Sequence, residues 1–127
     1  MPDKITPSGT GVVRLKTRPQ FLFVRAGQSE RRRALVVQAR RRQHGEHVGE
    51  GFTATKKIGN AVIRNRAKRR LRAAAQSLLP RLGLANCDYV FIARAETATI
   101  GWQRLLDDME SALISLAVKF QASADKN

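Results

Sequence analysis

The stretch KKIGNAVIRNRAKRRLRAA, residues 56–74, holds eight Lys or Arg residues and no Asp or Glu. From Asn60, a typical N-cap residue, its apolar side chains recur every three or four residues and form one stripe on a helix. This stripe is predicted to pack on a hydrophobic core, and Pro80 is expected to end the helix after Leu79. The helix therefore places a dense cationic surface on a globular domain. The predicted stripe consists of Ile63, Ala67, Leu71, Ala74 and Leu78.

Cations fill most of the helix surface that the apolar stripe leaves free. Arg64, Lys68 and Arg72 fall in one row, and Asn65 and Arg69 fall in the row beside it. Like charges four residues apart cost a helix ~0.2–0.5 kcal/mol per pair, and the helix contains no acid to offset them. A surface suited only to solubility would mix the two signs. Because Arg also suits bidentate contact with phosphate, we interpret the surface as a binding face for a polyanion rather than as an ordinary solvated face.

The start of this helix has a second feature that suits an anion. Gly59 and Asn60 precede it, and the first N–H groups of a helix point outward with a partial positive charge. A glycine at this point lets another backbone approach closely. A Gly-Asn pair is also typical of a plain turn and cap, so both interpretations stay open.

The composition of the whole chain agrees with a polyanionic partner. The chain has 127 residues, of which 43% are hydrophobic, and this is typical of one folded domain. It carries 24 Lys and Arg against 10 Asp and Glu, a net charge of +14, which favours nucleic acid first and an anionic membrane second. No apolar run approaches the ~20 residues that span a bilayer, and the first residues lack an apolar signal segment, so we expect a cytoplasmic protein. The expected organisation is a disordered tail over residues 1–10, a single nucleic-acid-binding domain over 11–120 and a frayed tail over 121–127.

Local patterns predict an α+β domain with one sheet and helices packed against it. Thr17 and Gln20 form a capping box for a first helix, which Gly27 ends. The helices are expected at residues 17–27, 60–79 and 101–120, and the strands at 34–40, 51–57 and 87–94. The last helix is nearly neutral, so we assign it to packing. Its predicted core face consists of Trp102, Leu105, Leu106, Met109, Leu113, Leu116, Ala117 and Phe120.

The predicted strand over residues 51–57 has one apolar and one polar face. Thr53, Thr55 and Lys57 share the polar face by alternation, while Phe52, Ala54 and Ile58 belong to the core. The polar face can simply meet water, or it can line a groove for a single nucleic-acid strand, with a nearby aromatic ring stacked on a base. Phe21 or Phe23 of the first helix can supply that ring, and ordinary core packing is the alternative role of either.

The run GFTATKKIGNAVIRNRAKRRLRAA, residues 51–74, closely resembles the signature of the bacterial ribonuclease P protein component. The resemblance extends in order from the first predicted helix to the last, over roughly residues 12–120. It implies the element order α-β-β-β-α-β-α in a two-layer sandwich with one four-stranded sheet. The Arg-rich helix would lie in a left-handed β-α-β crossover, which the usual right-handed rule for such connections does not predict.

The resemblance also implies a function in tRNA processing. Members bind a large catalytic RNA, and the assembled enzyme removes the 5′ leader from precursor tRNA. By position, the RNA-contacting residues are Arg64, Asn65, Arg66, Lys68, Arg69 and Arg72. Those of the leader-binding cleft are Phe21, Thr53, Thr55 and Lys57. Arg25 and Gln38 stand where other members have cleft aromatics, so leader affinity is expected to depend more on charge here.

The residues do not suggest a catalytic site within the chain itself. A protein nuclease usually needs clustered carboxylates for metal ions or an oriented histidine base. The only acidic cluster is Asp107, Asp108 and Glu110, and it lies on the near-neutral last helix. His44 and His47 are read as loop histidines rather than as zinc ligands. We therefore expect no catalytic residue, no protein metal site and no organic cofactor, with Mg²⁺ held mainly by the partner RNA and no further protein partner required.

Other functional classes remain as alternatives at this point. A ribosomal or other structural RNA-binding protein would share the basic helix and the α+β fold without a role in tRNA processing. A DNA-binding regulator would need a helix-turn-helix pair, which the sequence does not show. A membrane binder would need bulky apolar residues beside the cations, whereas the stripe in residues 60–79 is largely Ala.

Overall fold

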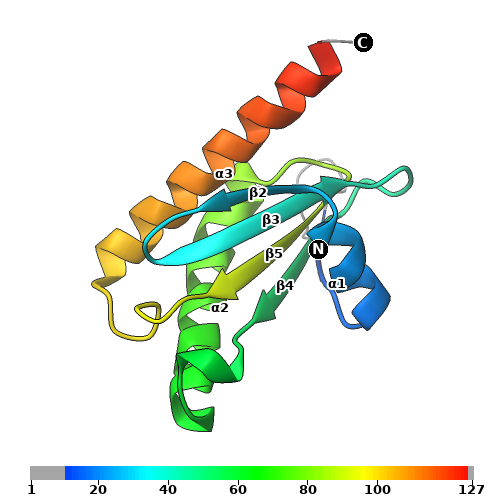
Figure 1. The fold of residues 1–127 in the computed structure, drawn as a ribbon. Coiled ribbons are helices and arrows are strands. Elements are labelled where there is room, and N and C mark those ends of the chain that lie inside the picture. Colours follow the sequence, from blue (N-terminus) through cyan, green and yellow to red (C-terminus); the bar gives the residue numbers. More distant parts are fainter. Residues whose placement is uncertain (1–10, 126–127) are drawn as a thin grey trace, which may run out of the picture.

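The computed structural model describes residues 11–125, which form one sheet with three α-helices (Figure 1). The expectations for residues 1–10 and 126–127 lie outside the described part of the chain. In chain order the elements are β1 (Val12–Arg14), α1 (Arg18–Arg25), β2 (Gln28–Arg31), β3 (Leu35–Arg41), β4 (Val48–Thr53), the 3-10 helix η2 (Lys56–Ile58), α2 (Ala61–Leu82), β5 (Cys87–Ala93) and α3 (Trp102–Asp125).

The sheet is mixed, with strand order β1-β4-β5-β3-β2. β1, β4 and β5 run parallel, while β3 is antiparallel to both β5 and β2. The α+β class with one sheet is confirmed, but the sheet has five strands instead of four. The two strands that local patterns did not predict, β1 and β2, are the two edges. β1 has three residues and β2 reads QSER, so neither shows an alternating apolar pattern.

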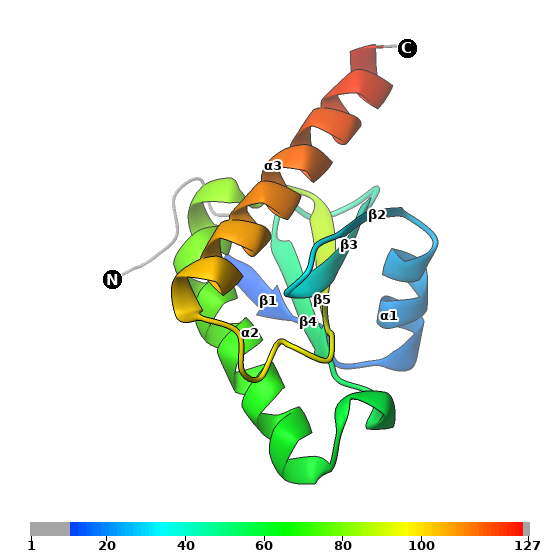
Figure 2. The ribbon, with the colours of Figure 1, turned by 60° about the vertical axis from the view of Figure 1, so that its left-hand side comes forward.

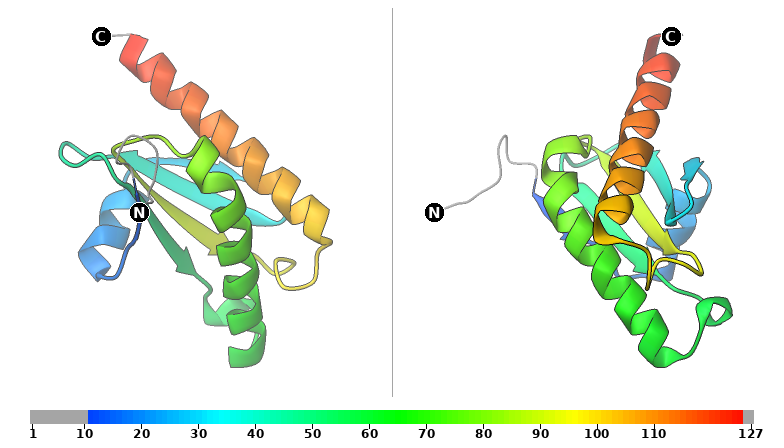
Figure 3. Two further views of the ribbon diagram at one scale, coloured as in Figure 1. Left: turned by 180° about the vertical axis from the view of Figure 1, so that it is seen from behind. Right: turned by 90° about the vertical axis from the view of Figure 1, so that its left-hand side faces the viewer.

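The connection from β4 through α2 to β5 joins two parallel strands, and its left-handed course is visible from behind the sheet (Figure 3). α2 and α3 cover one face of the sheet, and α1 lies against the other face (Figure 2). The basic helix α2 therefore packs on the sheet along one side only. Its remaining surface, where most of the cations lie, faces outward.

Two groups of buried side chains hold these layers together. The larger group lies between the sheet and α2 and α3 and includes Phe91, Leu71 and Leu105, each fully buried. The ring of Phe91 stacks on that of Phe52 with centroids 5.4 Å apart. Burying one such side chain contributes roughly 1.5–3 kcal/mol, so this group dominates the stability of the fold. The smaller group lies beneath α1 and consists of Leu15, Val24 and Val90, with Phe21, Phe23 and Ile92 packed against it.

The predicted strand over residues 51–57 is wrong at its C-terminal end. β4 ends at Thr53, and residues Lys56–Ile58 form the 3-10 helix η2. This turn leads into Gly59, whose φ of +145° strongly favours glycine. The chain leaves the sheet here because it must reach the start of α2. Thr55 and Lys57 therefore do not continue the polar face of the strand.

Two helices are longer than predicted, and two of their apolar residues are misplaced. α2 continues past Pro80 to Leu82, because a proline in the last turn removes a single helix N–H donor. α3 continues past Phe120 to Asp125. Ile63 and Trp102, both predicted to be in the core, are 38% and 43% exposed. Each belongs to the first turn of its helix, where the helix extends beyond the sheet (Figure 1).

Candidate nucleic-acid interface

The outer surface of α2 carries a set of cations that the described part of the chain does not neutralise. Arg66 and Arg69 are exposed, and Lys68 is half-buried. Within residues 11–125, none of these three side chains takes part in a hydrogen bond or an ion pair. Cations without a partner in this part of the chain repel one another, so binding of a polyanion would stabilise this surface. Of the residues predicted by resemblance to contact RNA, Asn65 and Arg72 are also exposed and Arg64 is half-buried.

Arg64 and Arg72 have contacts that the helical pattern did not indicate. The Nε of Arg64 is buried and has no hydrogen-bond partner within the described residues. The guanidinium of Arg72 lies 5.9 Å from the centroid of the Phe52 ring, on which Arg14 also lies, at 5.1 Å. Phe52 thus holds Arg72 against the body of the protein, which lowers the entropy that this side chain would lose on binding an anion.

Arg70 is the basic residue of α2 that has a structural role. It donates to the carbonyl of Thr97 at 2.6 Å and to that of Ile100. Burial, followed by the charge of Arg66, lowers the pKa of Arg70. The segment between β5 and α3 is therefore fastened to α2 by this guanidinium. Neighbouring arginines on one helix thus divide into one that holds the fold and others that face outward.

The helix start at Gly59 and Asn60 has the geometry of a cap. Asn60 Oδ1 accepts a hydrogen bond from the N–H of Ile63 at 3.0 Å, and the Asn60 carbonyl accepts from the N–H of Arg64 at 2.9 Å. The plain cap interpretation is therefore confirmed. An anion at this helix start stays a prediction that this geometry does not test.

A groove on the α1 side of the sheet brings together most of the residues predicted for the leader cleft. We call it the Phe21 groove; it has a volume of about 460 Å³. Phe21, Thr53 and Thr55 line it, together with Arg25 and Gln38. Lys57 does not line it, because the chain has turned into η2 at that point. Its full lining is Arg18, Phe21, Leu22, Arg25, Gln38, Thr53, Thr55, Val90 and Ile92.

Sequence reasoning did not predict two features of this groove. The ring of Phe21 packs so closely over Gly51 that a Cβ there would lie 2.7 Å from two of its ring atoms, so a glycine is needed beneath the aromatic. Arg18 lies about two helical turns before Arg25 on the same side of α1 and adds a second cation to the groove. The spacing of Arg18, Leu22 and Arg25 in the sequence could have predicted that Arg18 joins the groove, because residues three and four apart share one helix face.

The two RRR clusters, Arg31–Arg33 and Arg40–Arg42, mostly contact the protein itself. Arg32 donates to Glu30 at 2.8 Å and to the hydroxyl of Ser115 at 3.0 Å, and so joins β2 to α3. Arg33 pairs with Glu96. The charge of these clusters is therefore partly neutralised within the fold, in contrast to that of α2.

The acidic cluster of α3 is divided between the surface and the core. Asp108 is buried and accepts a hydrogen bond from the N–H of Ala34, whereas Asp107 is exposed. Within residues 11–125, no group of three or more His, Cys, Asp or Glu side chains is arranged to hold a metal ion. A search of the same residues finds no helix that is both long and apolar enough to cross a membrane.

Comparisons with known proteins agree with the resemblance in the basic stretch. The family model for Ribonuclease P matches residues 11–117. A ribonuclease P protein component of Caulobacter vibrioides is 51% identical over 114 residues, which cover 89% of this chain and 76% of the relative. One of Ruegeria pomeroyi is 45% identical over 112 residues, with 86% and 90% covered. The solved structure of the Staphylococcus aureus RNase P protein is 28% identical, has a TM-score of 0.70, and covers 81% of this chain and 94% of its own. This chain therefore belongs to the ribonuclease P protein family.

Proposed function

We propose that this chain, as the protein subunit of ribonuclease P, binds the catalytic RNA through α2 and the 5′ leader of precursor tRNA in the Phe21 groove. The observation that carries this division is the set of α2 cations without a hydrogen bond or ion pair within residues 11–125, namely Arg66, Lys68 and Arg69. They lie on the opposite side of the sheet from the groove. Two RNA-binding surfaces on opposite faces of one sheet let the protein bridge an enzyme RNA and its substrate. The names of the relatives favour this function over that of a structural ribosomal protein.

The contacts to the catalytic RNA are assigned to Arg64, Asn65, Arg66, Lys68, Arg69 and Arg72. Each would offset phosphate charge, and the planar guanidiniums would add bidentate hydrogen bonds. The helix start at Gly59 and Asn60 would receive a phosphate at the N–H groups of the first turn. These roles are supported by the outward course of α2 and by the exposure of most of these side chains.

The leader contacts are assigned to Phe21, Thr53 and Thr55, with Arg18 and Arg25 on phosphates. A half-buried aromatic beside two hydroxyls suits a single strand, because any base can stack on the ring. Lys57 is retained as a contact for a flanking phosphate, since it is exposed next to the groove residue Thr55. Gln38 lines the groove without adding a second ring.

The hydrolytic chemistry is assigned to the partner RNA, with Mg²⁺ held mainly by that RNA. The acidic residues of the chain support this assignment. In the cluster of Asp107, Asp108 and Glu110, Asp108 already accepts a hydrogen bond from the buried backbone N–H of Ala34. The role of the protein would be to lower phosphate–phosphate repulsion between two RNAs. Salt and Mg²⁺ compete for the same phosphates, so both can replace part of this role.

A reconstitution experiment tests the proposal. Cleavage of a precursor tRNA is followed with the protein alone, with the partner RNA alone and with both, over a series of Mg²⁺ concentrations. We expect no cleavage by the protein alone, slow cleavage by the RNA at high Mg²⁺, and a lower Mg²⁺ requirement when both are present. Cleavage by the protein alone, lost in a matched preparation of an unfolded variant, would overturn the assignment of chemistry to the RNA.

A further inference from the structure

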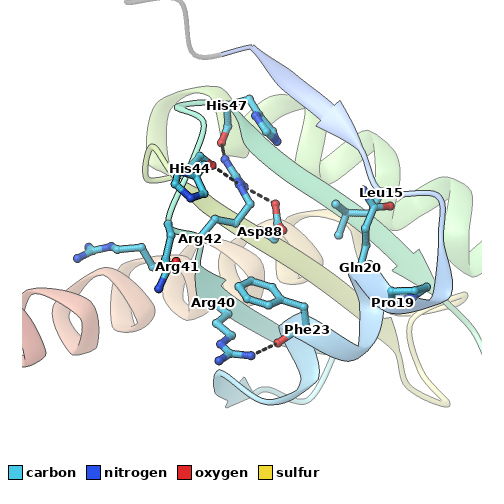
Figure 4. A pocket seen from close by; sticks show the side chains of 11 residues that line it. Leu15, Pro19, Gln20, Phe23, Arg40, Arg41, Arg42, His44, His47 and Asp88 are labelled. Atoms are coloured by element: carbon cyan, nitrogen blue, oxygen red, sulfur yellow. Dashed lines mark hydrogen bonds and ion pairs between the residues drawn. The ribbon is translucent and has the colours of Figure 1, made fainter.

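A second pocket lies on the same face of the sheet as the Phe21 groove, on the other side of α1. We call it the Phe23 pocket; its volume is about 610 Å³. In β3, Gln38 lines the groove and Arg40 lines the pocket, and Arg42, just after the strand, lines the pocket as well. Pro19, Gln20 and Phe23 of α1 form its opposite side (Figure 4). The proposed leader contacts do not use this pocket.

Its rim is a loop that is organised around one guanidinium. The Nε of Arg42 donates to the carbonyl of His44 at 3.2 Å, and its Nη2 donates to the carbonyls of Gly45, at 3.1 Å, and His47. Its Nη1 forms an ion pair with Asp88. Because one side chain satisfies these acceptors, the loop holds His44 and His47 at the pocket without help from a ligand.

The ion pair at the base of this loop is itself built into the sheet. Asp88 is 4% exposed. A Cβ on Gly49 of the neighbouring strand β4 would lie 2.0 Å from the Oδ1 of Asp88, so position 49 needs a glycine. A buried carboxylate that loses its cation leaves an uncompensated charge, which is strongly destabilising. Arg42 therefore stays in place, and Asp88 largely neutralises its charge.

The remaining lining combines an aromatic surface with polar side chains. The guanidinium of Arg40 lies 4.3 Å from the centroid of the Phe23 ring, and its Nη1 donates to the Phe23 carbonyl at 3.1 Å (Figure 4). Leu15 and Pro19 extend the apolar surface. The Oε1 of Gln20 accepts from the N–H groups of Lys16 and Thr17, and its amide nitrogen donates to no group within the described residues.

We propose that the Phe23 pocket binds one nucleotide of a single-stranded RNA segment. The base would pack on the Phe23–Arg40 pair and the apolar side chains, with an edge toward the Gln20 amide. The phosphate would lie toward the rings of His44 and His47, at the opposite end of the pocket from Arg40, which stays on the Phe23 ring (Figure 4). The π-face of a base and the negative charge of a phosphate both match this lining, because proteins bind single strands by combining stacking with charge. The proposal rests on the proposed function only in taking RNA as the available polyanion.

The chain offers a specific probe of this pocket. It has two histidines, and both belong to the pocket lining. The proton NMR signals of the two imidazole Hε1 atoms in the full-length protein therefore report on the Phe23 pocket alone. Adenosine 5′-monophosphate, inorganic phosphate and a hexamer of adenylate are titrated separately at one ionic strength. We expect saturable shifts of both signals with the nucleotide, tighter binding of the hexamer, and smaller shifts with phosphate.

Two matched variants separate this pocket from the Phe21 groove. Phe23→Leu keeps the apolar bulk and removes the ring, and it should weaken the nucleotide affinity seen by the histidines roughly tenfold, because one stacking contact is lost. Phe21→Leu makes the same change on the other side of α1 and should leave that affinity unchanged. Three results would each overturn the proposal that this pocket binds a nucleotide: equal shifts with phosphate and nucleotide, shifts that do not saturate, or an unchanged nucleotide affinity in the Phe23→Leu variant. A hexamer no tighter than the mononucleotide would overturn the assignment to RNA. The outcomes with the mononucleotide and with phosphate do not depend on whether the Phe21 groove binds the leader.

Discussion

The carboxylate of Asp108 on α3 accepts a hydrogen bond from the backbone N–H of Ala34, immediately before β3, with 3.0 Å between Oδ2 and nitrogen. Both residues are buried. The other carboxylate oxygen accepts from the Nε of Arg104, also at 3.0 Å. Asp108 thus joins the last helix to the sheet. It differs from Asp107 beside it, which is exposed and, within residues 11–125, accepts only from the amide of Gln103.

Substitution of these neighbouring acids should have very different effects on stability. Asp108→Ala leaves a buried N–H without an acceptor, so we expect the free energy of unfolding to fall by about 1–3 kcal/mol. Asp107→Ala should change it by less than ~0.5 kcal/mol, as is usual at the surface. Urea unfolding followed by circular dichroism measures both. Cleavage by the assembled enzyme should be unchanged in either folded variant, and a rate loss with assembly intact would show that the acid takes part in the chemistry.

Asp108 also shows where prediction from sequence ends. Periodicity predicted α2, α3 and β5, because a long apolar stripe or a continuous apolar run is a local property of the chain. It could not predict that Asp108 meets Ala34, since that contact depends on how α3 crosses the sheet. The edge strands β1 and β2 were missed because pairing with a neighbour, not composition, makes them strands. For the candidate site, the outward surface of α2 followed from helical spacing, whereas Lys57 was misplaced because the turn at η2 was not recognised.

Arg69 and Arg70 offer a neighbouring pair that separates RNA binding from stability. Arg69 is exposed and makes no hydrogen bond within the described residues, so Arg69→Ala should leave the free energy of unfolding nearly unchanged. It should weaken binding of the partner RNA by about 1–3 kcal/mol if the phosphate contact is bidentate. Arg70→Ala removes the bonds to Thr97 and Ile100 and should destabilise the fold. RNA filter binding and urea unfolding together measure this, and equal RNA affinity for Arg69→Ala and the wild type would exclude that contact.

Glu30 should make stability depend on pH in the acid range. Hydrogen bonds from Lys119, and then from Arg32, lower the pKa of Glu30 below its ordinary value of 4.5. A carboxyl whose pKa is depressed in the folded state contributes stability above the unfolded pKa and loses it as pH falls through the folded pKa. Glu30→Gln should therefore flatten the decline in the urea midpoint between neutral pH and pH values below 4.5.

Glu96→Gln is the matched control for this measurement. Glu96 pairs with Arg33, but both side chains are largely exposed, so the pair should contribute little at any pH. If Glu30→Gln and Glu96→Gln show the same acid slope as the wild type, the links from Glu30 to Lys119 and Arg32 do not stabilise the join between β2 and α3.

The Phe21 groove predicts a difference between two substrates of the assembled enzyme. Phe21→Leu keeps the packing against Leu15 and Val24 but removes the aromatic ring, so the fold should be retained. Precursor tRNA should bind more weakly by ~1–3 kcal/mol, the value of one stacked base, while mature tRNA, which has no leader, should bind as before. Equilibrium binding of both RNAs to the assembled enzyme provides the comparison.

Gln38→Tyr makes the opposite change in the same groove. Gln38 lines the groove on β3, and a ring at this position would add a second stacking surface beside Phe21. We expect precursor tRNA to bind more tightly, with a weaker dependence on salt, because less of the affinity would then come from Arg18 and Arg25 on phosphates. Mature tRNA again serves as the control. If Phe21→Leu weakens both substrates equally and Gln38→Tyr strengthens neither, then the groove does not hold the leader, and the single strand must follow another path across the protein.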